Sequence, residues 1–219
     1  MNLFDIVGPV MVGPSSSHTA GAVKIGNVCN KMMGEPIKSA YIFLHGSFAA
    51  TGKGHGTDRA LIAGLLGMAV DDTEIPNAFS IALSKGMRYT IETIDLGDVH
   101  PNSVKIMMIG QSGRQLEVVA SSIGGGRIEI CKLDGNEANF SGENPTLIVR
   151  NMDQPGCITE VTSLLGEKGI NIATMNLHRK KRGGEAIMVI ECDQQVPEEI
   201  MDALERLDGI FGVAYFSPR

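Results

Sequence analysis

The amino-acid sequence predicts an α+β protein of two domains, and three observations lead to this fold class. The chain of 219 residues has 43% hydrophobic and 20% charged residues, enough apolar material for two small cores. Turn-forming residues dominate 133–145, which places a domain boundary near Asn144. After that segment, strand and helix periodicities alternate regularly. We therefore expect an N-terminal α+β domain with an antiparallel sheet over 1–143 and a ferredoxin-like βαββαβ domain over 146–219.

In the second half, the hydrophobic spacing follows the order βαββαβ. Gly169 is typical of the residue that ends a helix, and Pro197 is typical of a residue that begins one. The predicted strands cover 146–150, 170–179, 185–192 and 210–216, and the predicted helices cover 157–168 and a segment that begins at Pro197.

The first half is less regular. Three consecutive serines, Ser15 to Ser17, are N-cap candidates for a helix over 18–33. A second helix is predicted over 58–68 and a third, short one after Pro76. The predicted strands cover 39–44, 87–94, 104–109, 114–120 and 127–131.

Composition excludes several classes of function. A net charge of −6 and an aromatic content of 5% without tryptophan do not favour binding to nucleic acid. No apolar run reaches the roughly 20 residues of a membrane span. The first residues, 1–5, lack the basic and apolar regions of a secretory signal, so we expect a cytoplasmic protein.

The four cysteines give no metal-binding pattern. Cys29, Cys131, Cys157 and Cys192 are widely spaced and contain no C-x-x-C pair. We interpret them as free thiols in or near the core, and we expect no metal site formed by this chain.

The first motif that could carry chemistry is Pro14-Ser15-Ser16-Ser17-His18-Thr19, which places four hydroxyls and one imidazole at the start of a predicted helix. Free N–H groups and the positive end of the helix dipole at such a position favour a bound carboxylate and a neutral His18. The alternative is that one serine caps the helix and the others are solvated.

The second motif is Thr51-Gly52-Lys53-Gly54-His55-Gly56-Thr57-Asp58, interpreted as a glycine-rich loop that leads into a helix. The glycines allow close approach of a ligand, and the other side chains supply a cation, a base and two oxygen groups. The spacing fits neither a Walker phosphate loop nor a dinucleotide-binding fingerprint. The alternative is a tight turn with Asp58 as an N-cap. His45 and His100 are isolated and are not included.

A third motif, Asp153-Gln154-Pro155-Gly156, is predicted at a turn between a strand and a helix. The N–H groups of Gly156 and Cys157 suit the carboxylate of a small amino acid, with Asn151 or Asp153 placed to meet its ammonium group. The alternative is that this domain only dimerises through a sheet edge.

Together, the first two motifs resemble the beta subunit of the bacterial iron–sulfur-dependent L-serine dehydratases. The second half resembles an ACT domain, a small regulatory module, on the basis of Asp153-x-Pro155-Gly156 and Gly169-Ile170-Asn171-Ile172-Ala173. The match spans nearly the whole chain. This resemblance implies effector binding at Asn151, Asp153, Gly156, Asn171 and Ile172, and side-by-side pairing of ACT domains in a larger assembly.

The resemblance also implies deamination of L-serine to pyruvate and ammonia by an enzyme that uses a [4Fe-4S] cluster. In that family the cluster belongs to the alpha portion, here a separate chain, where an open iron acts as a Lewis acid on the leaving hydroxyl while a base removes the Cα proton. The implied catalytic residues are His55 and Thr57. The implied substrate-binding residues are Ser15, Ser17, His18, Thr19, Lys53 and Asp58.

The first half is also similar in fold to the allosteric substrate-binding domain of some phosphoglycerate dehydrogenases. This similarity implies an alternative in which His18 and His55 bind a regulatory serine and the chain is an amino-acid sensor that takes no part in the chemistry. A phosphate-handling enzyme is disfavoured by the glycine spacing. A pyridoxal phosphate enzyme is disfavoured because no lysine motif for the imine is recognisable.

Overall fold

The computed structural model describes residues 10–179 and 181–218, except for the side chain of Lys53. The chain divides into two compact units, with the division between Gly135 and Asn136. Within the described residues, no helix has the length and apolar character needed to cross a membrane.

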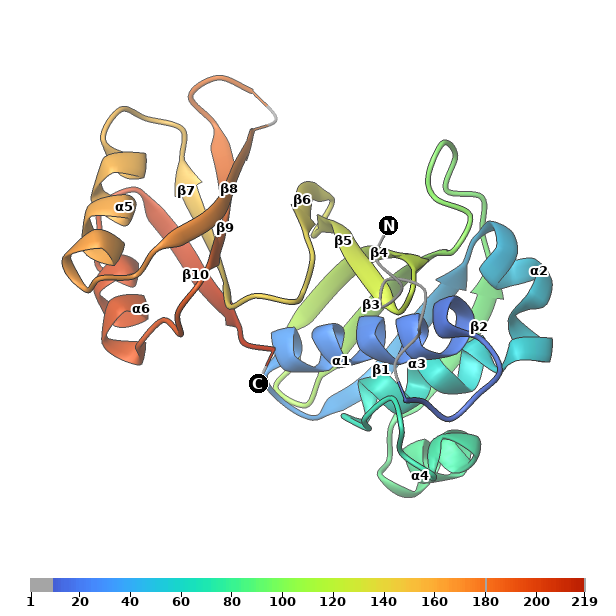
Figure 1. Cartoon of the computed structure of the whole chain (residues 1–219). Helices are drawn as coiled ribbons and strands as arrows, with labels where there is room; N and C mark the ends of the chain where they lie inside the picture. Colours follow the sequence, from blue (N-terminus) through green and yellow to red (C-terminus); the bar gives the residue numbers. More distant parts are fainter. Residues whose placement is uncertain (1–9, 180, 219) are drawn as a thin grey trace. The chain divides into compact units, whose positions relative to one another are not determined.

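The first unit contains one sheet and a set of helices (Figure 1). It begins with a π-helical turn, labelled η2, that continues directly into α1. The predicted N-terminal helix is therefore confirmed, although its first turn is wider than an α-helix. The helical elements are η2 Ser16–Ala20, α1 Gly21–Met33, α2 Gly46–His55, α3 Thr57–Leu65, η3 Ile75–Asn77 and α4 Ala78–Ser84.

The sheet has the strand order β2-β1-β3-β4-β5-β6. Its strands are β1 Ile37–Leu44, β2 Arg88–Thr93, β3 Ser103–Gly110, β4 Gln115–Gly124, β5 Arg127–Leu133 and β6 Asn136–Phe140, at which the second unit begins. The pairs β1–β3, β3–β4 and β4–β5 are antiparallel, as predicted, but β1 and β2 are parallel. This difference arises because three helices, α2 to α4, separate β1 from β2 and return the chain to the end of the sheet where β1 begins.

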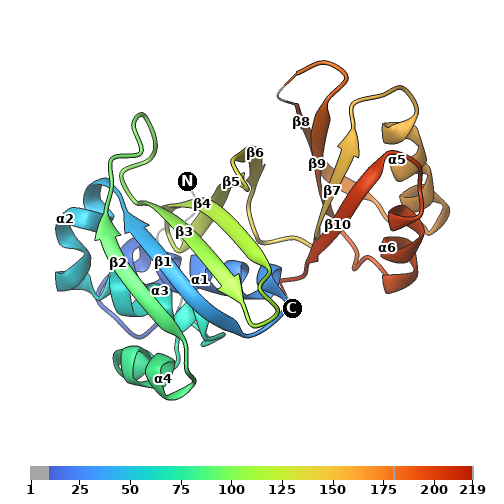
Figure 2. The ribbon, with the colours of Figure 1, turned by 180° about the vertical axis from the view of Figure 1, so that it is seen from behind.

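The helices α1 and α3 cover one face of this sheet, and Figure 2 shows strands β1 to β4 from the other side with no helix in front of them. On that open face, Tyr41 and Met107 are paired in the sheet register and are 42% and 40% exposed. The core lies between the sheet and the helices, where Ile25, Leu61 and Ile106 are fully buried.

The second unit has the predicted ferredoxin-like fold. Its four-stranded sheet has the order β10-β7-β9-β8, and each neighbouring pair is antiparallel. Two helices contribute Val161, Leu165, Ile200 and Leu204 to its core. The elements are β7 Thr146–Met152, α5 Cys157–Glu167, β8 Ile172–Arg179, β9 Glu185–Cys192, α6 Glu198–Glu205 and β10 Ile210–Phe216.

The turn-rich segment before this sheet contains a strand that the sequence did not predict. In β6, Ala138 and Phe140 are buried while their neighbour Asn139 is exposed, the alternation expected for a strand with one buried face. The surrounding Gly, Asn and Glu residues concealed this pattern, because only two apolar side chains carry it.

Candidate functional site

The first motif begins the N-terminal helix with a defined cap. Ser15 has an extended backbone, and its Oγ accepts a hydrogen bond of 3.1 Å from the backbone N–H of His18. The interpretation of one serine as an N-cap therefore holds for Ser15. Ser16 and Ser17 lie in the π-helical turn, a form of helix that is common at functional sites.

The ring of His18 is held between two hydroxyl groups. Its Nδ1 lies 3.4 Å from Ser15 Oγ, and its Nε2 lies 3.0 Å from Ser47 Oγ at the start of α2. Burial lowers the pKa of His18, the nearby His55 lowers it further, and the hydrogen bond with Ser47 acts in the opposite direction. The neutral imidazole is the favoured form, as the sequence predicts.

The second motif is not a loop. Residues 46–55 form α2, so the glycines Gly52 and Gly54 lie inside its last turns. The prediction of a glycine-rich loop is wrong because the helical spacing continues through both glycines. The chain breaks only at Gly56, whose φ of 68° is left-handed and separates α2 from α3.

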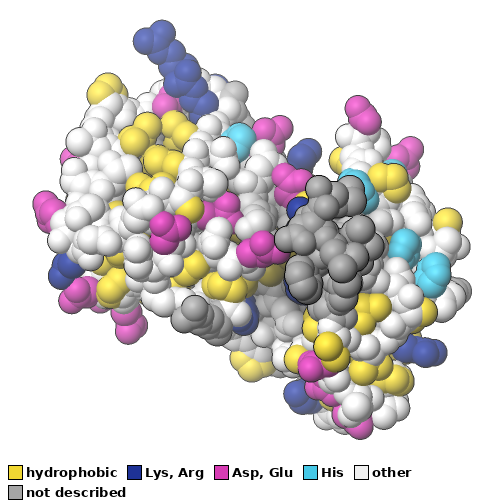
Figure 3. All heavy atoms as spheres, viewed as in Figure 1, with side chains coloured by type: hydrophobic (Ala, Val, Ile, Leu, Met, Phe, Trp, Pro, Cys, Tyr) yellow, Lys and Arg dark blue, Asp and Glu magenta, His cyan; other side chains and the backbone are white. Residues whose placement is uncertain are grey.

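The structure brings the two motifs together. The ring centroids of His18 and His55 are 4.9 Å apart, and Phe48 lies against His18 with a centroid distance of 5.4 Å. The hydroxyl of Thr19 donates a 3.1 Å hydrogen bond to the carbonyl of His55. Figure 3 shows histidine side chains gathered on the side of the first unit that carries α2.

Two polar atoms of the second motif are buried without a partner among the described residues. They are Nδ1 of His55 and Oγ1 of Thr57, and the side chain of Thr57 is completely buried. Buried polar groups are usually hydrogen-bonded, so two unpaired atoms in consecutive turns indicate a place for a ligand or for ordered water. Asp58 follows in the first turn of α3, where its Oδ1 accepts a hydrogen bond from the N–H of Arg59.

A pocket of about 220 Å³ opens beside these residues. Thr19, His55 and Arg59 line it together with the backbone around Gly13 and Gly54. The side chain of Lys53, which the sequence assigns to this site, lies outside the described residues. The pocket is smaller than the roughly 300–1,000 Å³ of sites for drug-sized ligands, which suits a small molecule.

Three residues of this region, Ser47, Phe48 and Arg59, are absent from the sequence prediction. Ser47 is 29 residues from His18 in the chain, so no local spacing reveals their contact. The sequence contains one indirect signal for Ser47 and Phe48. If 46–55 is read as a helix, its period places both residues near the same face as His55.

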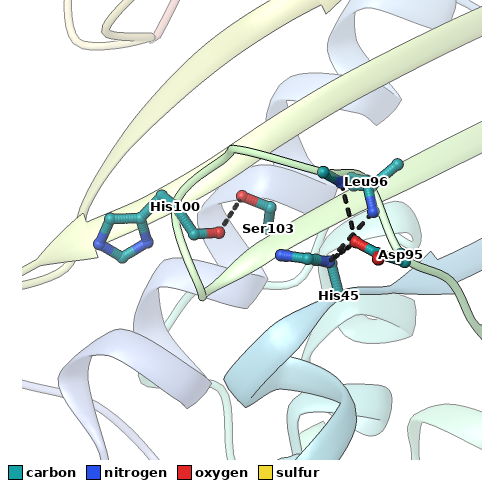
Figure 4. Close-up of polar contacts among 6 residues, drawn as sticks. His45, Asp95, Leu96, His100 and Ser103 are labelled. Atoms are coloured by element: carbon teal, nitrogen blue, oxygen red, sulfur yellow. Dashed lines mark hydrogen bonds and ion pairs between the residues drawn. The ribbon is translucent and has the colours of Figure 1, made fainter.

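The two histidines that were excluded have roles in a loop. His45 Nδ1 accepts a 3.1 Å hydrogen bond from the N–H of Leu96 and lies 3.7 Å from Asp95, as Figure 4 shows. The carbonyl of His100 accepts a hydrogen bond from Ser103, and its ring points away from His45 in the same view. Both histidines organise the segment between β2 and β3.

In the second unit, Asp153 is already paired. Its Oδ2 accepts hydrogen bonds from Arg179 at 2.7 Å and from the N–H of Gly183 at 2.9 Å. These two contacts, with the Gly183 bond the larger cause, hold the pKa of Asp153 below its usual value. Oδ2 of this carboxylate is therefore already paired within the chain, and a role for Asp153 in meeting an ammonium group stays a prediction. Asn151 is buried and donates to the carbonyl of Met152, while its Oδ1 has no partner among the described residues.

The five predicted effector residues do not form one cluster within the chain. Asn151 pairs with Ala186 at one end of β9, whereas Ile172 pairs with Cys192 at the other end. The six residue steps from Ala186 to Cys192 along β9 separate these two positions by roughly 20 Å. The separation follows from the fold, because α5 carries the chain from the C-terminal end of β7 back to the opposite end of the strands, where β8 begins. Asn171 there bonds to Asp193 and Gln194, and Gly156 with a φ of 103° precedes α5.

The four cysteines are free thiols, of which Cys29, Cys157 and Cys192 are buried and Cys131 is half-buried, as the sequence predicts. Burial raises the pKa of Cys29 to about 12 and that of Cys192 to about 11, and it also raises the pKa of Cys131. Within residues 10–179 and 181–218, no three His, Cys, Asp or Glu side chains converge on a common point.

Comparison with protein families defines the class of this chain. Residues 2–92 match the family described as serine dehydratase beta chain, and residues 145–209 match the ACT domain family. The fold and the site thus define a chain in which a unit with a histidine-lined pocket precedes an ACT domain.

Curated relatives give the particular family. The chain is 43% identical over 212 residues to the probable L-serine dehydratase beta chain of Bacillus subtilis (strain 168), covering 97% of this chain and 96% of that protein. It is 42% identical over 202 residues to the L-serine dehydratase beta chain of Peptoniphilus asaccharolyticus, covering 92% and 91% of the two chains. The protein belongs to the family of L-serine dehydratase beta chains.

A more distant similarity extends to another class of enzyme. The D-3-phosphoglycerate dehydrogenase of Methanocaldococcus jannaschii is 28% identical over 194 residues, which cover 88% of this chain and 36% of that protein. The two units described above thus have a counterpart within a much longer dehydrogenase chain.

Proposed function

We propose that this protein is the beta chain of a two-chain L-serine dehydratase, an L-serine ammonia-lyase that converts L-serine to pyruvate and ammonia. The observation that carries this proposal is the meeting of the His18 and His55 rings, with centroids 4.9 Å apart, beside the pocket that His55 lines and next to two buried polar atoms without a partner among the described residues. Membership of the beta-chain family supports the choice of substrate.

In this proposal, His55 and Thr57 face the reacting part of the substrate. The unpaired Nδ1 of His55 can accept or donate a proton, and the unpaired Oγ1 of Thr57 can orient a substrate group. Ser15 and Thr19 act through the histidines, since their hydroxyls already contact His18 and the His55 carbonyl.

The remaining predicted residues have supporting roles. Ser17 and His18 contact the substrate, Lys53 adds positive charge, and Asp58 favours the start of α3 through its position in the first turn.

The proposal assigns the [4Fe-4S] cluster to an alpha chain, and the beta chain is inactive without it. The name of the beta-chain relatives supports such a partner. We further propose that the ACT domains pair side by side in the assembly, that they regulate it, and that the enzyme is cytoplasmic. The limits 1–143 and 146–219 remain our proposed domain boundaries.

The test is a beta chain reconstituted anaerobically with its alpha chain. We expect His55→Ala and Thr57→Val each to lower turnover of L-serine by roughly 100-fold or more, the usual effect of losing a proton-transfer group. His100→Ala, which removes an exposed ring outside the pocket, is the matched control and should retain activity. Turnover within threefold of the unmodified complex, with cluster content intact, would remove His55 and Thr57 from catalysis.

A second candidate function is an amino-acid sensor in which the pocket binds serine without taking part in the reaction. The 28% identity to a D-3-phosphoglycerate dehydrogenase favours it, because the two units then also occur within an enzyme named for a different reaction, as a binding module would. Calorimetric titration of L-serine into the isolated beta chain distinguishes the two. Tight binding without the alpha chain favours the sensor, whereas binding only in the complex favours a shared active site.

A further inference from the structure

One charged side chain outside the predicted motif residues lines the His55 pocket. Arg59 shares this pocket with Thr19 and His55, and it lies in the first turn of α3. The residue is exposed, and among the residues that the structure describes its guanidinium forms no ion pair. The pocket therefore contains a permanent positive charge that no carboxylate of the described chain neutralises.

The guanidinium of Arg59 is held in place by aromatic rings. Its central carbon lies 5.8 Å from the ring centroid of Phe79 in α4. Phe79 in turn stacks on Tyr89 of β2, with centroids 5.3 Å apart and an angle of 21° between the rings. The cation–π contact attracts the guanidinium toward Phe79 and uses none of its N–H donors.

The position of Arg59 is not explained by the stability of the helix. A cation in the first turn of a helix is unfavourable, because the helix dipole places positive charge there. Asp58 offsets part of this effect, but its Oδ1 is bonded to the backbone N–H of Arg59 rather than to the guanidinium. Among the described residues, the fold supplies Arg59 with an aromatic ring but with no anion, and a bound carboxylate would supply one.

We propose that Arg59 binds the carboxylate of the substrate in the His55 pocket. The inference rests on the proposed function and narrows it, because it limits the substrates to small amino acids with a free carboxylate. A planar guanidinium can bind both carboxylate oxygens at once, which fixes the orientation of the amino acid. Arg59 is thus a binding residue that presents the substrate to His55 and Thr57.

The experiment compares L-serine with L-serinamide, which lacks the carboxylate, in the reconstituted two-chain complex. We expect the unmodified complex to prefer L-serine strongly. Arg59→Ala should raise KM for L-serine by roughly 10- to 100-fold, as expected for loss of a hydrogen-bonded charge pair, and should change kcat less. Arg59→Lys should have an intermediate effect. Arg127→Ala, which alters an exposed arginine of β5, is the matched control and should leave both constants unchanged.

A second measurement does not depend on turnover or on the folding of a variant. Phenylglyoxal modifies accessible arginines, and mass spectrometry of the unmodified complex can locate the adducts. L-serine should protect Arg59 from modification, L-serinamide should not, and Arg127 should react equally in all samples.

The inference is overturned if Arg59→Ala retains the preference for L-serine within twofold, or if L-serine gives Arg59 no protection. Should Arg59→Ala fail to assemble, Arg59→Lys and the labelling decide the question. Absence of serine turnover in the unmodified complex would instead contradict the proposed function, and the labelling would still report on Arg59 by itself.

Discussion

The protonation of His18 depends on its immediate neighbours. Burial and the ring of His55, whose centroid is 4.9 Å away, both disfavour the imidazolium form, and the hydrogen bond with Ser47 only partly opposes them. The pKa of His18 in the folded chain is therefore below its ordinary value of 6.5. A neutral His18 has one ring nitrogen that can accept a proton, which suits a site for proton transfer.

This lowered pKa predicts how stability changes with pH. The unfolded chain takes up a proton on His18 at a higher pH than the folded chain, so acidification favours unfolding. This destabilisation is absent above the pKa that His18 has in the unfolded chain. It grows as the pH falls from about 6.5 toward the lowered pKa of His18 in the folded chain. We expect His18→Gln to show a shallower fall of Tm between about pH 7.5 and about pH 5, the range in which histidine titrates.

The control for this prediction is His100→Gln, since His100 is an exposed histidine of the same unit. Its Tm profile gives the effect of removing a histidine that lies outside the pocket. Equal slopes for the His18→Gln variant and the unmodified chain would show that His18 does not titrate differently in the folded and unfolded states.

The candidate residues of the site could be recognised in the sequence, but their supporting contacts could not. His18, His55 and Thr57 were identified because their motifs combine unusual residue types within a few positions. Ser47 and Arg59 occur in no such combination, and their roles arise from contacts between distant segments or across a pocket. Long-range contacts of this kind depend on the helix α2, which the sequence did not predict.

At the scale of elements, the contact between α1 and α3 depends on two glycines. A Cβ built at Gly64 would lie 2.1 Å from the carbonyl oxygen of Val23 and 2.8 Å from Cα of Gly26. A Cβ at Gly26 would lie 2.5 Å from the carbonyl oxygen of Leu61. The two helix backbones approach so closely that neither position has space for a side chain, and α3 in turn positions Thr57 and Arg59.

This geometry predicts that Gly64→Ala destabilises the protein despite the better helix propensity of alanine. Overpacking costs about 1–3 kcal/mol, and here the neighbours are backbone atoms that cannot move aside. Gly166→Ala in α5, where nothing lies within 4 Å of the added carbon, is the control and should stabilise by up to about 1 kcal/mol. Denaturant unfolding measures both changes, and a neutral Gly64→Ala variant would show that the helices can separate without cost.

The secondary structure that the sequence predicted well has a strong periodicity. All six elements from β7 to β10 were predicted, because each contains several regularly spaced apolar residues between clear turn signals. The elements that were missed lack such a signal. Helix α2 contains Gly46, Gly52 and Gly54, which disfavour a helix locally, so tertiary packing around the buried Phe48 determines it.

At the scale of the whole chain, the second unit includes residues before the predicted domain limit of 146. Ser141 donates two hydrogen bonds to Oε1 of Glu191, one from its N–H at 3.1 Å and one from its hydroxyl at 2.6 Å. Thr174 donates to the other carboxylate oxygen at 2.8 Å. Glu191 is only 6% exposed, so the segment at 136–141 supplies most of the hydrogen bonds to a buried carboxylate.

We therefore expect a fragment of residues 136–219 to be more stable than one of residues 146–219. The shorter fragment leaves Oε1 of Glu191 without either donor, which costs roughly 1–3 kcal/mol, and it also loses the burial of Phe140, whose ring centroid lies 6.4 Å from that of Phe216. Chemical unfolding of the two fragments measures this difference.

A substitution at Glu191 separates the carboxylate from the lost apolar contact. In the fragment of 136–219, Glu191→Gln removes an acceptor that three donors satisfy and should lower the unfolding free energy. In the fragment of 146–219, the same change removes a poorly satisfied buried charge and should raise stability or leave it unchanged. A change of equal size and sign in both fragments would show that Ser141 and Glu191 are not coupled. The segment at 136–141 would then be a connection between units rather than part of the second one.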